Sequence, residues 1–276
     1  MDYRGRVAIV TGASSGIGRQ VACDCAARGM AVVIAARRRE QLEEVAAACT
    51  AAGGAVEVAV GDVAERAFVE SLVERALARF GRLDVVVNNA GISKHKQIYA
   101  VTADEVEYVV RVNLLAPAWL TLAALPAMLR RGEGYVINVS SAAGRIVPPR
   151  ETVYAASKFG LTGFTEGLTL DLQGSGIHAA VIHVGPIDTE IWQKTDEPTA
   201  FRGRKHPPRI VSVAIFEAIE RRRHDVWVPR WMKLAYGFRL LSGRLYRAGA
   251  ARFDPVPAAV VDAARARAAS ARTGLP

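Results

Sequence analysis

Residues 153–160 read VYAASKFG and place a phenol, Tyr154, four positions before an ammonium, Lys158. Only alanine and serine separate the two residues, so the stretch is compatible with a helix. On a helix, side chains four positions apart share a face, and these two polar heads can converge on one point. The pair could therefore act together on a proton, or it could be a solvated pair on a surface helix.

The elements that would position this pair recur in a regular order. Short β-branched runs alternate with longer stretches rich in Ala, Glu and Arg, which is typical of strand–helix repeats around a parallel sheet. Near-continuous apolar runs further indicate strands that are covered on both faces. The sequence predicts strands at residues 7–10, 31–35, 56–60, 85–87, 135–139, 177–183 and 226–228. It predicts helices near 16–28, 40–52, 65–80, 103–130, 154–173 and 209–223, the fourth of them opened by a capping box from Thr102 to Glu105.

Length and composition bound the class of protein. Of the 276 residues, 51% are hydrophobic and 23% are charged, as in a globular α/β protein. No low-complexity linker interrupts the series of elements, which favours one domain over two small ones. No apolar run approaches the ~18 residues that span a bilayer, and the strand-like segment RVAIV begins at Arg6, where a signal peptide would lie. We therefore expect a cytoplasmic protein, attached to a membrane at most peripherally.

The three cysteines, Cys23, Cys25 and Cys49, lie in the first fifth of the chain. No C-x-x-C pair occurs, and the first ninety residues contain no histidine. No metal site is expected, and the thiols are interpreted as structural.

The net charge of +9 is concentrated in one segment. Residues 202–252 contain thirteen Lys and Arg against three Asp and Glu, which leaves 23 against 24 in the rest of the chain. The body of the protein is therefore close to neutral, and a nucleic-acid partner is not expected.

The first expected strand leads into a glycine-rich turn and then a helix. The turn has the spacing G-x-x-x-G-x-G and includes Gly12, Ser14, Ser15, Gly16, Ile17 and Gly18. Glycines here let the backbone approach a pyrophosphate, and a helix N-terminus favours negative charge. The turn is a candidate dinucleotide site, although an ordinary tight turn has the same composition.

The second expected strand runs into Ala36 and three arginines. In dinucleotide-binding folds, an acid at this strand tip accepts the ribose 2′-hydroxyl, whereas an arginine accommodates a 2′-phosphate. Here Arg37 and Arg38 precede the first carboxylate, Glu40, and guanidinium groups match phosphate geometry. The strand tip favours NADP(H) over NAD(H); the alternative is that the arginines only decorate the start of a helix.

Several motifs then occur in the order in which one enzyme family carries them. They are TGASSGIG at 11–18, GDV at 61–63, NNAG at 88–91, Asn113, VSSAAG at 139–144 and YAASK at 154–158. Together they resemble the short-chain dehydrogenase/reductase family over residues 6 to about 229. The resemblance implies a single doubly wound Rossmann-type α/β domain with a parallel seven-stranded sheet. It also implies a nicotinamide cofactor, interconversion of a carbonyl and an alcohol, and a homodimer or homotetramer.

The resemblance assigns catalysis to Tyr154, Lys158, Ser141 and Asn113. Hydride transfer to a ketone leaves an alkoxide, and Tyr154 would supply its proton as the general acid. A phenol has an ordinary pKa near 10, and the Lys158 ammonium would lower that pKa besides holding the nicotinamide ribose. Ser141 would bind the substrate oxygen, and Asn113 would anchor a proton-relay water.

The same resemblance assigns further cofactor contacts. Asp62 and Val63 match the pair that contacts the adenine, and Asn89, Ala90 and Gly91 match the motif beside the cofactor. Ile187 and Thr189 match the positions that contact the carboxamide of the nicotinamide. The family's Pro-Gly-x-Val/Ile-x-Thr begins with Val184 here, a departure that bears on the rigidity of this loop.

Substrate specificity is expected in loops after the strands, at residues 92–100, 145–152 and 189–208. Five apolar residues there could line a pocket or only anchor the loops: Ile146, Val147, Pro148, Ile191 and Trp192. His95 and His183 are expected to be structural or surface residues.

The sequence thus predicts an NADP(H)-dependent oxidoreductase (EC 1.1.1.-) that acts on an apolar carbonyl or secondary alcohol. Two alternatives remain. One is a catalytically silent binding protein on the same scaffold, against which the intact Asn–Ser–Tyr–Lys set argues. The other is a protein that binds a membrane or nucleic acid through its basic C-terminal segment.

The catalytic domain is expected to span residues 1–229, with a helical extension at 230–276 that is not an independent domain. An apolar stripe at helical spacing runs through Trp231, Leu234, Phe238, Leu241 and Leu245. Arg230, Lys233, Arg244 and Arg247 lie largely away from it. The stripe could pack on the protein's own body or on a dimer partner. Alternatively, residues 230–247 could rest on an anionic membrane or form a lid over a lipid-like substrate.

Overall fold

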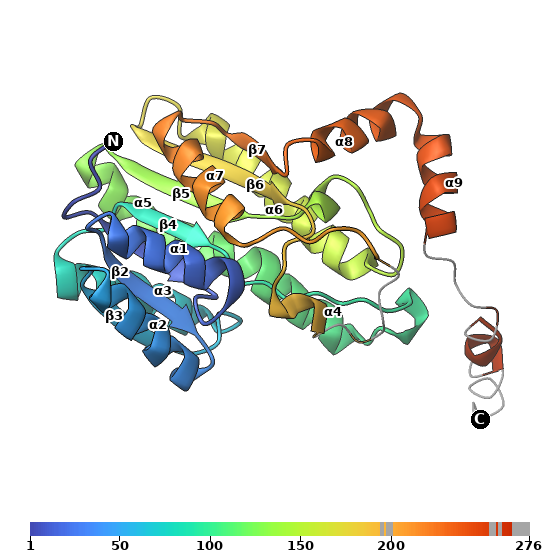
Figure 1. Cartoon of the computed structure of the whole chain (residues 1–276), viewed down its shortest axis with the longest axis horizontal. Coiled ribbons are helices and arrows are strands. Elements are labelled where there is room, and N and C mark those ends of the chain that lie inside the picture. Colours follow the sequence, from blue (N-terminus) through green and yellow to red (C-terminus); the bar gives the residue numbers. More distant parts are fainter. Residues whose placement is uncertain (194–195, 197–200, 254–257, 259–260, 267–276) are drawn as a thin grey trace.

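The computed structural model describes residues 1–193, 196, 201–253, 258 and 261–266. Its centre is one parallel seven-stranded sheet in the order β3-β2-β1-β4-β5-β6-β7 (Figure 1). The strands are β1 (Val7–Thr11), β2 (Ala31–Ala36), β3 (Val56–Val60), β4 (Val85–Asn88), β5 (Gly134–Val139), β6 (Ile177–Val184) and β7 (Asp225–Val228). The prediction of seven strands is confirmed, with every boundary within one residue.

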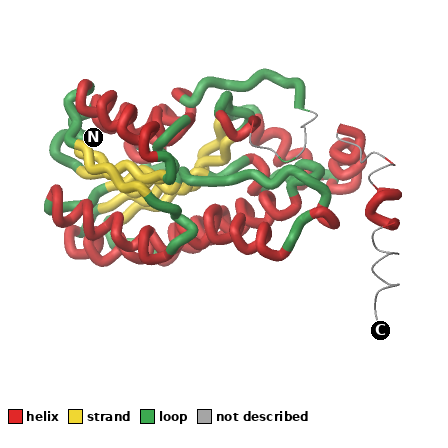
Figure 2. The backbone as a smooth tube through the Cα atoms, turned by 90° about the horizontal axis from the view of Figure 1, so that it is seen from below, coloured by secondary structure: helices red, strands yellow, loops and turns green. Residues whose placement is uncertain are grey.

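Helices cover both faces of the sheet (Figure 2). The core on one face is shared by α1 (Gly16–Ala27), α2 (Arg39–Ala51) and α7 (Arg209–Glu220). The core on the other face is shared by α3 (Arg66–Phe80), α5 (Ala116–Arg131) and α6 (Thr152–Asp171). Because both faces are buried, strand residues are apolar on each side, which is why the strands lack alternation in the sequence.

The fourth predicted helix, at residues 103–130, is interrupted. It consists of α4 (Ala103–Val110), a π-helical turn at Arg111–Leu115, and α5. The capping box is confirmed, because the Thr102 side chain accepts from the Glu105 amide and the Glu105 carboxylate accepts from the Thr102 amide. The span Ala103–Arg131 is long and apolar enough to cross a bilayer. However, half of its apolar window is buried inside the fold, as in a core helix.

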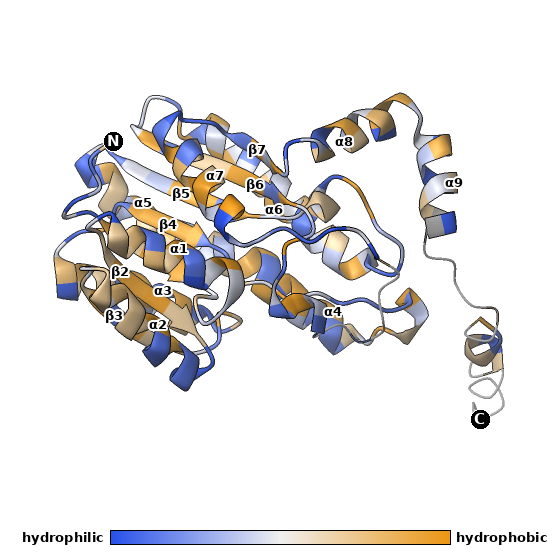
Figure 3. Ribbon diagram, in the orientation of Figure 1, coloured by the Kyte–Doolittle hydropathy of each residue, from blue (hydrophilic) through white to orange (hydrophobic). Residues whose placement is uncertain are grey.

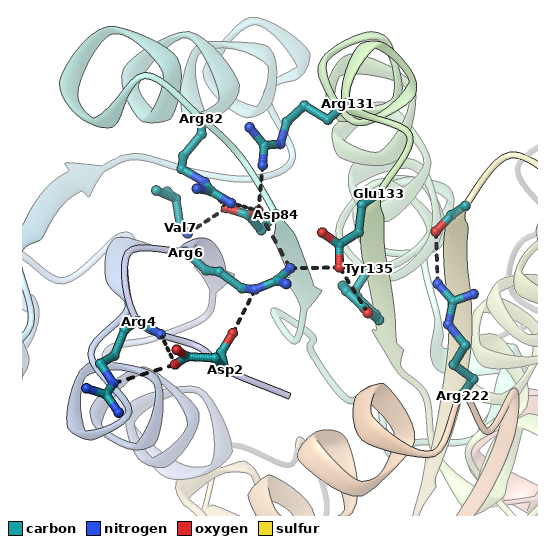
Figure 4. Close-up of polar contacts among 11 residues, drawn as sticks. Asp2, Arg4, Arg6, Val7, Arg82, Asp84, Arg131, Glu133, Tyr135 and Arg222 are labelled. Atoms are coloured by element: carbon teal, nitrogen blue, oxygen red, sulfur yellow. Dashed lines mark hydrogen bonds and ion pairs between the residues drawn. The ribbon is translucent and has the colours of Figure 1, made fainter.

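The amino ends of the central strands meet around a buried carboxylate, Asp84, which directly precedes β4 (Figure 4). Its oxygens accept from the Val7 amide at 2.9 Å and from two nitrogens of Arg82 at 2.8 and 2.6 Å. Arg6 and Arg131 contribute guanidinium nitrogens 3.9 and 3.7 Å from the same carboxylate. This cluster ties β1, β4 and the end of α5 together at the edge opposite the glycine-rich turn.

After β7 the chain forms α8 (Met232–Leu241) and α9 (Gly243–Phe253), which leave the sheet at one end of the molecule (Figure 1). The extended backbone of Ser242, with φ −146° and ψ 82°, separates the two helices. The predicted stripe of residues 231–245 is therefore divided between two helices.

Candidate functional site

The candidate catalytic residues meet at the carboxyl edge of the sheet. Helix α6 begins at Thr152, two residues earlier than predicted, so Tyr154 lies in its first turn and Lys158 one turn later. Lys158 is only 3% exposed, and its Nζ donates to the carbonyl oxygen of Val139 at the end of β5 at 3.0 Å. Its Nζ lies 6.0 Å from the centre of the Tyr154 ring. The solvated-pair interpretation is therefore wrong.

The two groups have shifted pKa values. Burial and then the Glu151 carboxylate raise the pKa of the Tyr154 phenol above its ordinary value, and a hydrogen bond with Ser141 acts in the opposite direction. Burial lowers the pKa of the Lys158 ammonium to about 8. The expectation that Lys158 lowers the pKa of Tyr154 is not met in this structure. The buried ammonium is directed to a backbone carbonyl, and the desolvation of the phenol dominates.

Asn113 projects from the π-helical turn into the same region. Its Oδ1 accepts from the Ile92 amide at 2.9 Å, and its Nδ2 donates to the Ile92 carbonyl at 2.9 Å and to the Ser157 hydroxyl at 3.0 Å. Asn113 is fully buried, so these bonds hold the chain after β4 against α6. π turns commonly occur at functional sites, and this one joins the loop after β4 to the helix that carries Tyr154.

Ser141 follows β5, where its Oγ accepts from the Ala143 amide at 3.1 Å. Ser140, the neighbouring hydroxyl, is instead buried and lies 3.2 Å from the Lys158 carbonyl oxygen. Of the two serines, only Ser141 is bonded to the Tyr154 phenol among the described contacts. Ser141, the serine that the resemblance assigns to the substrate oxygen, is therefore the one that lies beside the phenol.

The glycine-rich turn lies beside this cluster, between β1 and α1, where the strand order reverses from β1 to β4. Gly12 adopts φ +66°, and a Cβ there would lie 2.8 Å from the Cα of Ala90. Gly16 adopts φ +54°, and a Cβ there would lie 2.9 Å from a methyl carbon of Thr189. Glycine is thus required at both positions by the positive φ and by close packing against the segments after β4 and β6. The turn leads into the N-terminus of α1, which favours an anionic ligand such as a pyrophosphate.

The NNAG motif braces this turn from the next strand. The Asn89 Nδ2 donates to the carbonyl oxygens of Thr11 and Gly12 at 3.0 and 3.3 Å. The Thr11 hydroxyl in turn accepts from the amides of Asn89 and Ala90, each at 3.1 Å. Beyond them, a Cβ on Gly91 would lie 3.4 Å from both Asn113 Oδ1 and Lys158 Nζ. The NNAG motif therefore connects the glycine-rich turn to the catalytic cluster.

The arginines at the tip of β2 differ in their contacts. The Arg37 Nη1 donates to the Tyr108 hydroxyl at 2.7 Å and lies 3.7 Å from Asp62. The Arg38 Nη2 donates to the hydroxyls of Ser14 and Ser15 at 3.1 and 2.9 Å. Its Nη1 pairs with Glu190 at 2.9 Å. Both guanidinium groups thus lie at the predicted adenosine end, and Arg38 also contacts the glycine-rich turn.

The remaining predicted cofactor residues lie around the same edge. The Asp62 carboxylate accepts from the Ala64 amide and the Tyr108 hydroxyl, and Val63 is buried beside it. Ile17 packs against the core under α1. Ile187 is buried and pairs with His206 as an isolated bridge. The Asp188 amide also donates to the His206 carbonyl at 2.8 Å, and the His206 amide donates to the Pro186 carbonyl at 2.9 Å. These bonds hold the loop after Val184, so this segment is ordered without the family's proline.

The three predicted substrate loops follow β4, β5 and β6. The third is described only in part, because residues 194, 195 and 197–200 lie outside the described chain. Trp192 is half-buried; its Nε1 donates to the Ile187 carbonyl at 2.6 Å, and its ring stacks on Phe201 at 5.4 Å. Ile146, Val147, Pro148 and Ile191 are also half-buried. Trp192 therefore serves as an anchor for its loop.

The sequence interpretation missed several residues around the site. Thr11, Tyr108, Glu151 and Glu190 contact or perturb site residues, although none was singled out. Glu151 directly precedes α6 and could have been noticed, because a carboxylate three residues before Tyr154 must affect its protonation. Tyr108 and Glu190 carry no local signal, because their partners are distant in the sequence.

The two histidines that were set aside are buried. His95 Nδ1 lies 3.6 Å from the Glu151 carboxylate, and His183 Nε2 lies 3.4 Å from Asp225. His183 also stacks on Trp227, with 4.5 Å between the ring centres. The three cysteines are free thiols, and burial raises the pKa of Cys25 and Cys49 to about 12. These thiols are therefore protonated near neutral pH, as expected of structural cysteines.

A doubly wound sheet with a glycine-rich turn at its crossover and this Ser–Tyr–Lys–Asn cluster defines a dinucleotide-binding oxidoreductase. The profile of the short chain dehydrogenase family matches residues 6–200. The chain belongs to this family.

Relatives and solved structures agree with that assignment. An uncharacterized oxidoreductase of Staphylococcus saprophyticus is 33% identical over 217 residues, which are 78% of this chain and 92% of the relative. A short-chain dehydrogenase/reductase from Burkholderia phymatum in complex with NAD aligns with a TM-score of 0.82 and 27% identity, covering 89% of this chain and 96% of that one. A short-chain dehydrogenase from Sphingobium yanoikuyae in complex with NADPH aligns with a TM-score of 0.76 and 27% identity, covering 87% and 96%.

Proposed function

We propose that this protein is an NADP(H)-dependent oxidoreductase that interconverts a carbonyl group and a secondary alcohol. The observation that carries the proposal is the convergence of Tyr154, Ser141 and Lys158 at the carboxyl edge of the sheet, beside the glycine-rich turn. In a chain of this family, such a cluster supports catalysis better than a silent binding role.

The chemistry follows from the groups present. The bound nicotinamide cofactor would supply or accept the hydride. Ser141 and Tyr154 hydrogen-bond to each other and can together hold a substrate oxygen, and Tyr154 then donates its proton as negative charge develops on that oxygen. Its raised pKa favours the protonated acid at neutral pH, which suits carbonyl reduction.

Lys158 and Asn113 have supporting roles. Below its pKa of about 8, the Lys158 ammonium is a buried positive charge that can bind a ribose hydroxyl. Asn113 fixes the backbone of Ile92 relative to α6. It thereby holds the segment after β4, which would border the cofactor, at a fixed position relative to Tyr154.

The preference for NADP(H) rests on the tip of β2. Strand β2 and its tip present Arg37 and Arg38 and no carboxylate before Glu40. A 2′-phosphate would gain charge-assisted hydrogen bonds from these guanidinium groups, whereas a 2′-hydroxyl finds no acid at the position that usually accepts it. The structural neighbours with NAD and with NADPH leave both cofactors possible for the fold; the arginines favour NADP(H).

The substrate class follows from the loops around Ser141. The loops after β5 and β6 carry half-buried apolar residues, including Ile146 and Ile191. They favour an apolar carbonyl compound over a charged one. The direct test is oxidation of NADPH by the purified protein across sterol, acyl and small aromatic carbonyls. Lack of turnover on the whole panel, together with tight NADPH binding, would favour a silent binding protein.

The cofactor preference has its own test. Arg37→Ala is expected to lower kcat/KM for NADPH by roughly ten- to a hundredfold, or about 1.5–3 kcal/mol, and to leave NADH nearly unaffected. Arg39→Ala is the matched control, because Arg39 pairs with Glu43 on α2 and is 68% exposed. If the wild-type protein already prefers NADH, the assignment of the β2 tip is wrong.

A further inference from the structure

The C-terminal extension carries apolar side chains that point away from the protein. Leu234 and Leu241 are 76% and 89% exposed, and Trp231, Phe238 and Leu245 are about half exposed or more. Four of the five recur at i, i+3, i+7 and i+10 along α8, and the fifth lies on α9. We call these five residues the outer stripe. Figure 3 shows α8 and α9 with strongly hydrophobic segments at the end of the molecule.

The opposite side of α8 is already in contact with the protein body. Tyr236 stacks on Trp227 with 5.7 Å between ring centres, and the Arg239 guanidinium lies 5.2 Å from the Phe159 ring. Arg239 also donates to the carbonyl oxygen of Arg145. From α9, the Tyr246 hydroxyl donates to the carbonyl of Val147 at 2.5 Å.

These contacts fix the orientation of the extension. Tyr236 and Arg239 face the body, whereas the outer stripe faces solvent, which is the reverse of a surface helix that packs its apolar face on its own core. Leu240 is also 68% exposed, so the apolar surface of α8 extends beyond the outer stripe. The interpretation of the stripe as a helix face docked on the body is therefore wrong for this structure. The docked face is the one with Tyr236 and Arg239.

The charge of the extension limits what can cover the stripe. Residues 230–253 contain six Lys and Arg and no Asp or Glu. Lys233, Arg244 and Arg247 are exposed on the same two helices. A second copy placed on this face by a two-fold axis would bring together two segments whose charged residues are all basic. Their mutual repulsion makes that arrangement unfavourable. An anionic bilayer satisfies both features, because it offers phosphates to the basic residues and an acyl boundary to the apolar ones.

We propose that residues 230–253 form a contact surface for anionic membranes. The outer stripe enters the boundary between head groups and acyl chains, and Lys233, Arg244 and Arg247 lie against lipid phosphates. The inner side meanwhile keeps its bonds to the loop at residues 145–147, directly after the segment that carries Ser141. If the proposed oxidoreductase function holds, on which this last step rests, the substrate loop then lies close to the bilayer and favours carbonyl compounds that partition into it.

The test is flotation of the full-length protein with vesicles made of equal parts phosphatidylglycerol and phosphatidylcholine. The protein is expected to float with these vesicles at low salt, to dissociate as salt screens the charges, and to bind pure phosphatidylcholine far more weakly. Leu234→Gln/Leu241→Gln should weaken partitioning about tenfold or more. Val213→Gln is the matched control, because Val213 is 52% exposed and belongs to α7, outside the extension, and this variant should bind like the wild type.

A second measurement locates the contact. Brominated acyl chains should quench tryptophan fluorescence in the wild type, and Trp231→Phe should remove most of that quenching and retain most of the flotation. The other three tryptophans lie at positions 119, 192 and 227. Quenching that persists in Trp231→Phe would place the lipid contact elsewhere and overturn the proposal.

The remaining outcomes are equally decisive. No flotation of the wild type, or flotation that is indifferent to anionic lipid, overturns the proposal. A loss of oligomer mass in Leu234→Gln/Leu241→Gln by light scattering would instead assign the stripe to a second copy. Flotation needs no turnover, so NADPH oxidation measured in parallel distinguishes failure of the membrane contact from failure of the proposed reaction.

Discussion

Each end of the sheet contains a buried charged side chain, and the two side chains differ in whether an opposite charge lies beside them. At the amino end, Asp84 is 1% exposed and is surrounded by Arg82, Arg6 and Arg131 and by the Val7 amide (Figure 4). At the carboxyl end, Lys158 is 3% exposed and donates to the Val139 carbonyl, and no described carboxylate forms an ion pair with it. One charge is compensated and the other is not.

This is the difference expected between a structural charge and one kept for the proposed function. A compensated carboxylate fixes the strands that it joins. An uncompensated ammonium costs folding free energy, and it is available to a phenolate or a ribose hydroxyl that approaches it. Active sites commonly retain such a cost. The comparison therefore predicts opposite effects on stability when each charge is removed.

The larger effect is expected at the amino end. Asp84→Asn keeps the size of the side chain but removes the charge from the bonds to Arg82 and the Val7 amide, and should lower the free energy of unfolding by about 3 kcal/mol. Urea denaturation measures the change. Asp2→Asn is the control, because the Asp2–Arg4 pair is 74% and 85% exposed, and it should have almost no effect. Equal effects of the two variants would show that the Asp84 cluster is not structural.

A smaller effect of opposite sign is expected at the carboxyl end. In Lys158→Met, the unfolding free energy at pH 7 should rise by about 2 kcal/mol, because relief of the desolvation penalty exceeds the lost hydrogen bond to Val139. The folded ammonium has its pKa lowered to about 8 from 10.5, so the unfolded chain binds this proton more tightly. The penalty is therefore complete below pH 8 and disappears as the pH rises from about 8 to 10.5.

The pH dependence provides the check on this variant. The advantage of Lys158→Met over the wild type should shrink across that pH range, as measured by urea denaturation at successive pH values. A destabilised variant at pH 7, or an advantage that grows with pH, would mean that Lys158 is compensated in the fold and that the comparison between the two ends fails.

The sequence predicts the sheet well because burial on both faces leaves a signal at every strand. All seven strands lie within one residue of their predicted bounds, and the glycine-rich turn lies where β1 meets α1. The candidate catalytic residues were named through a family resemblance, and the fold brings them together. These features are determined by residues close to one another in the sequence, or by short motifs, and can therefore be predicted from the sequence alone.

The parts that the sequence did not predict depend on distant contacts. The π-helical turn at Asn113 accompanies bonds to the Ile92 backbone and to Ser157, and no local pattern reports them. The pairing of Arg38 with Glu190 joins residues more than 150 positions apart. The orientation of α8 was also hidden, because a helical apolar stripe normally faces inward and here the bonds of Arg239 and Tyr246 turn it outward.

The central claim is that Tyr154 supplies the proton in a hydride-transfer reaction, and Tyr154→Phe tests it most directly. The substitution removes the phenolic oxygen and keeps the ring. With the best carbonyl substrate from the NADPH screen, kcat should fall about a thousandfold. The Kd for NADPH, measured by fluorescence titration, should stay within about twofold of the wild-type value, because Lys158 is the residue proposed to bind the ribose. A variant that binds NADPH normally and retains most of the wild-type turnover would contradict the account.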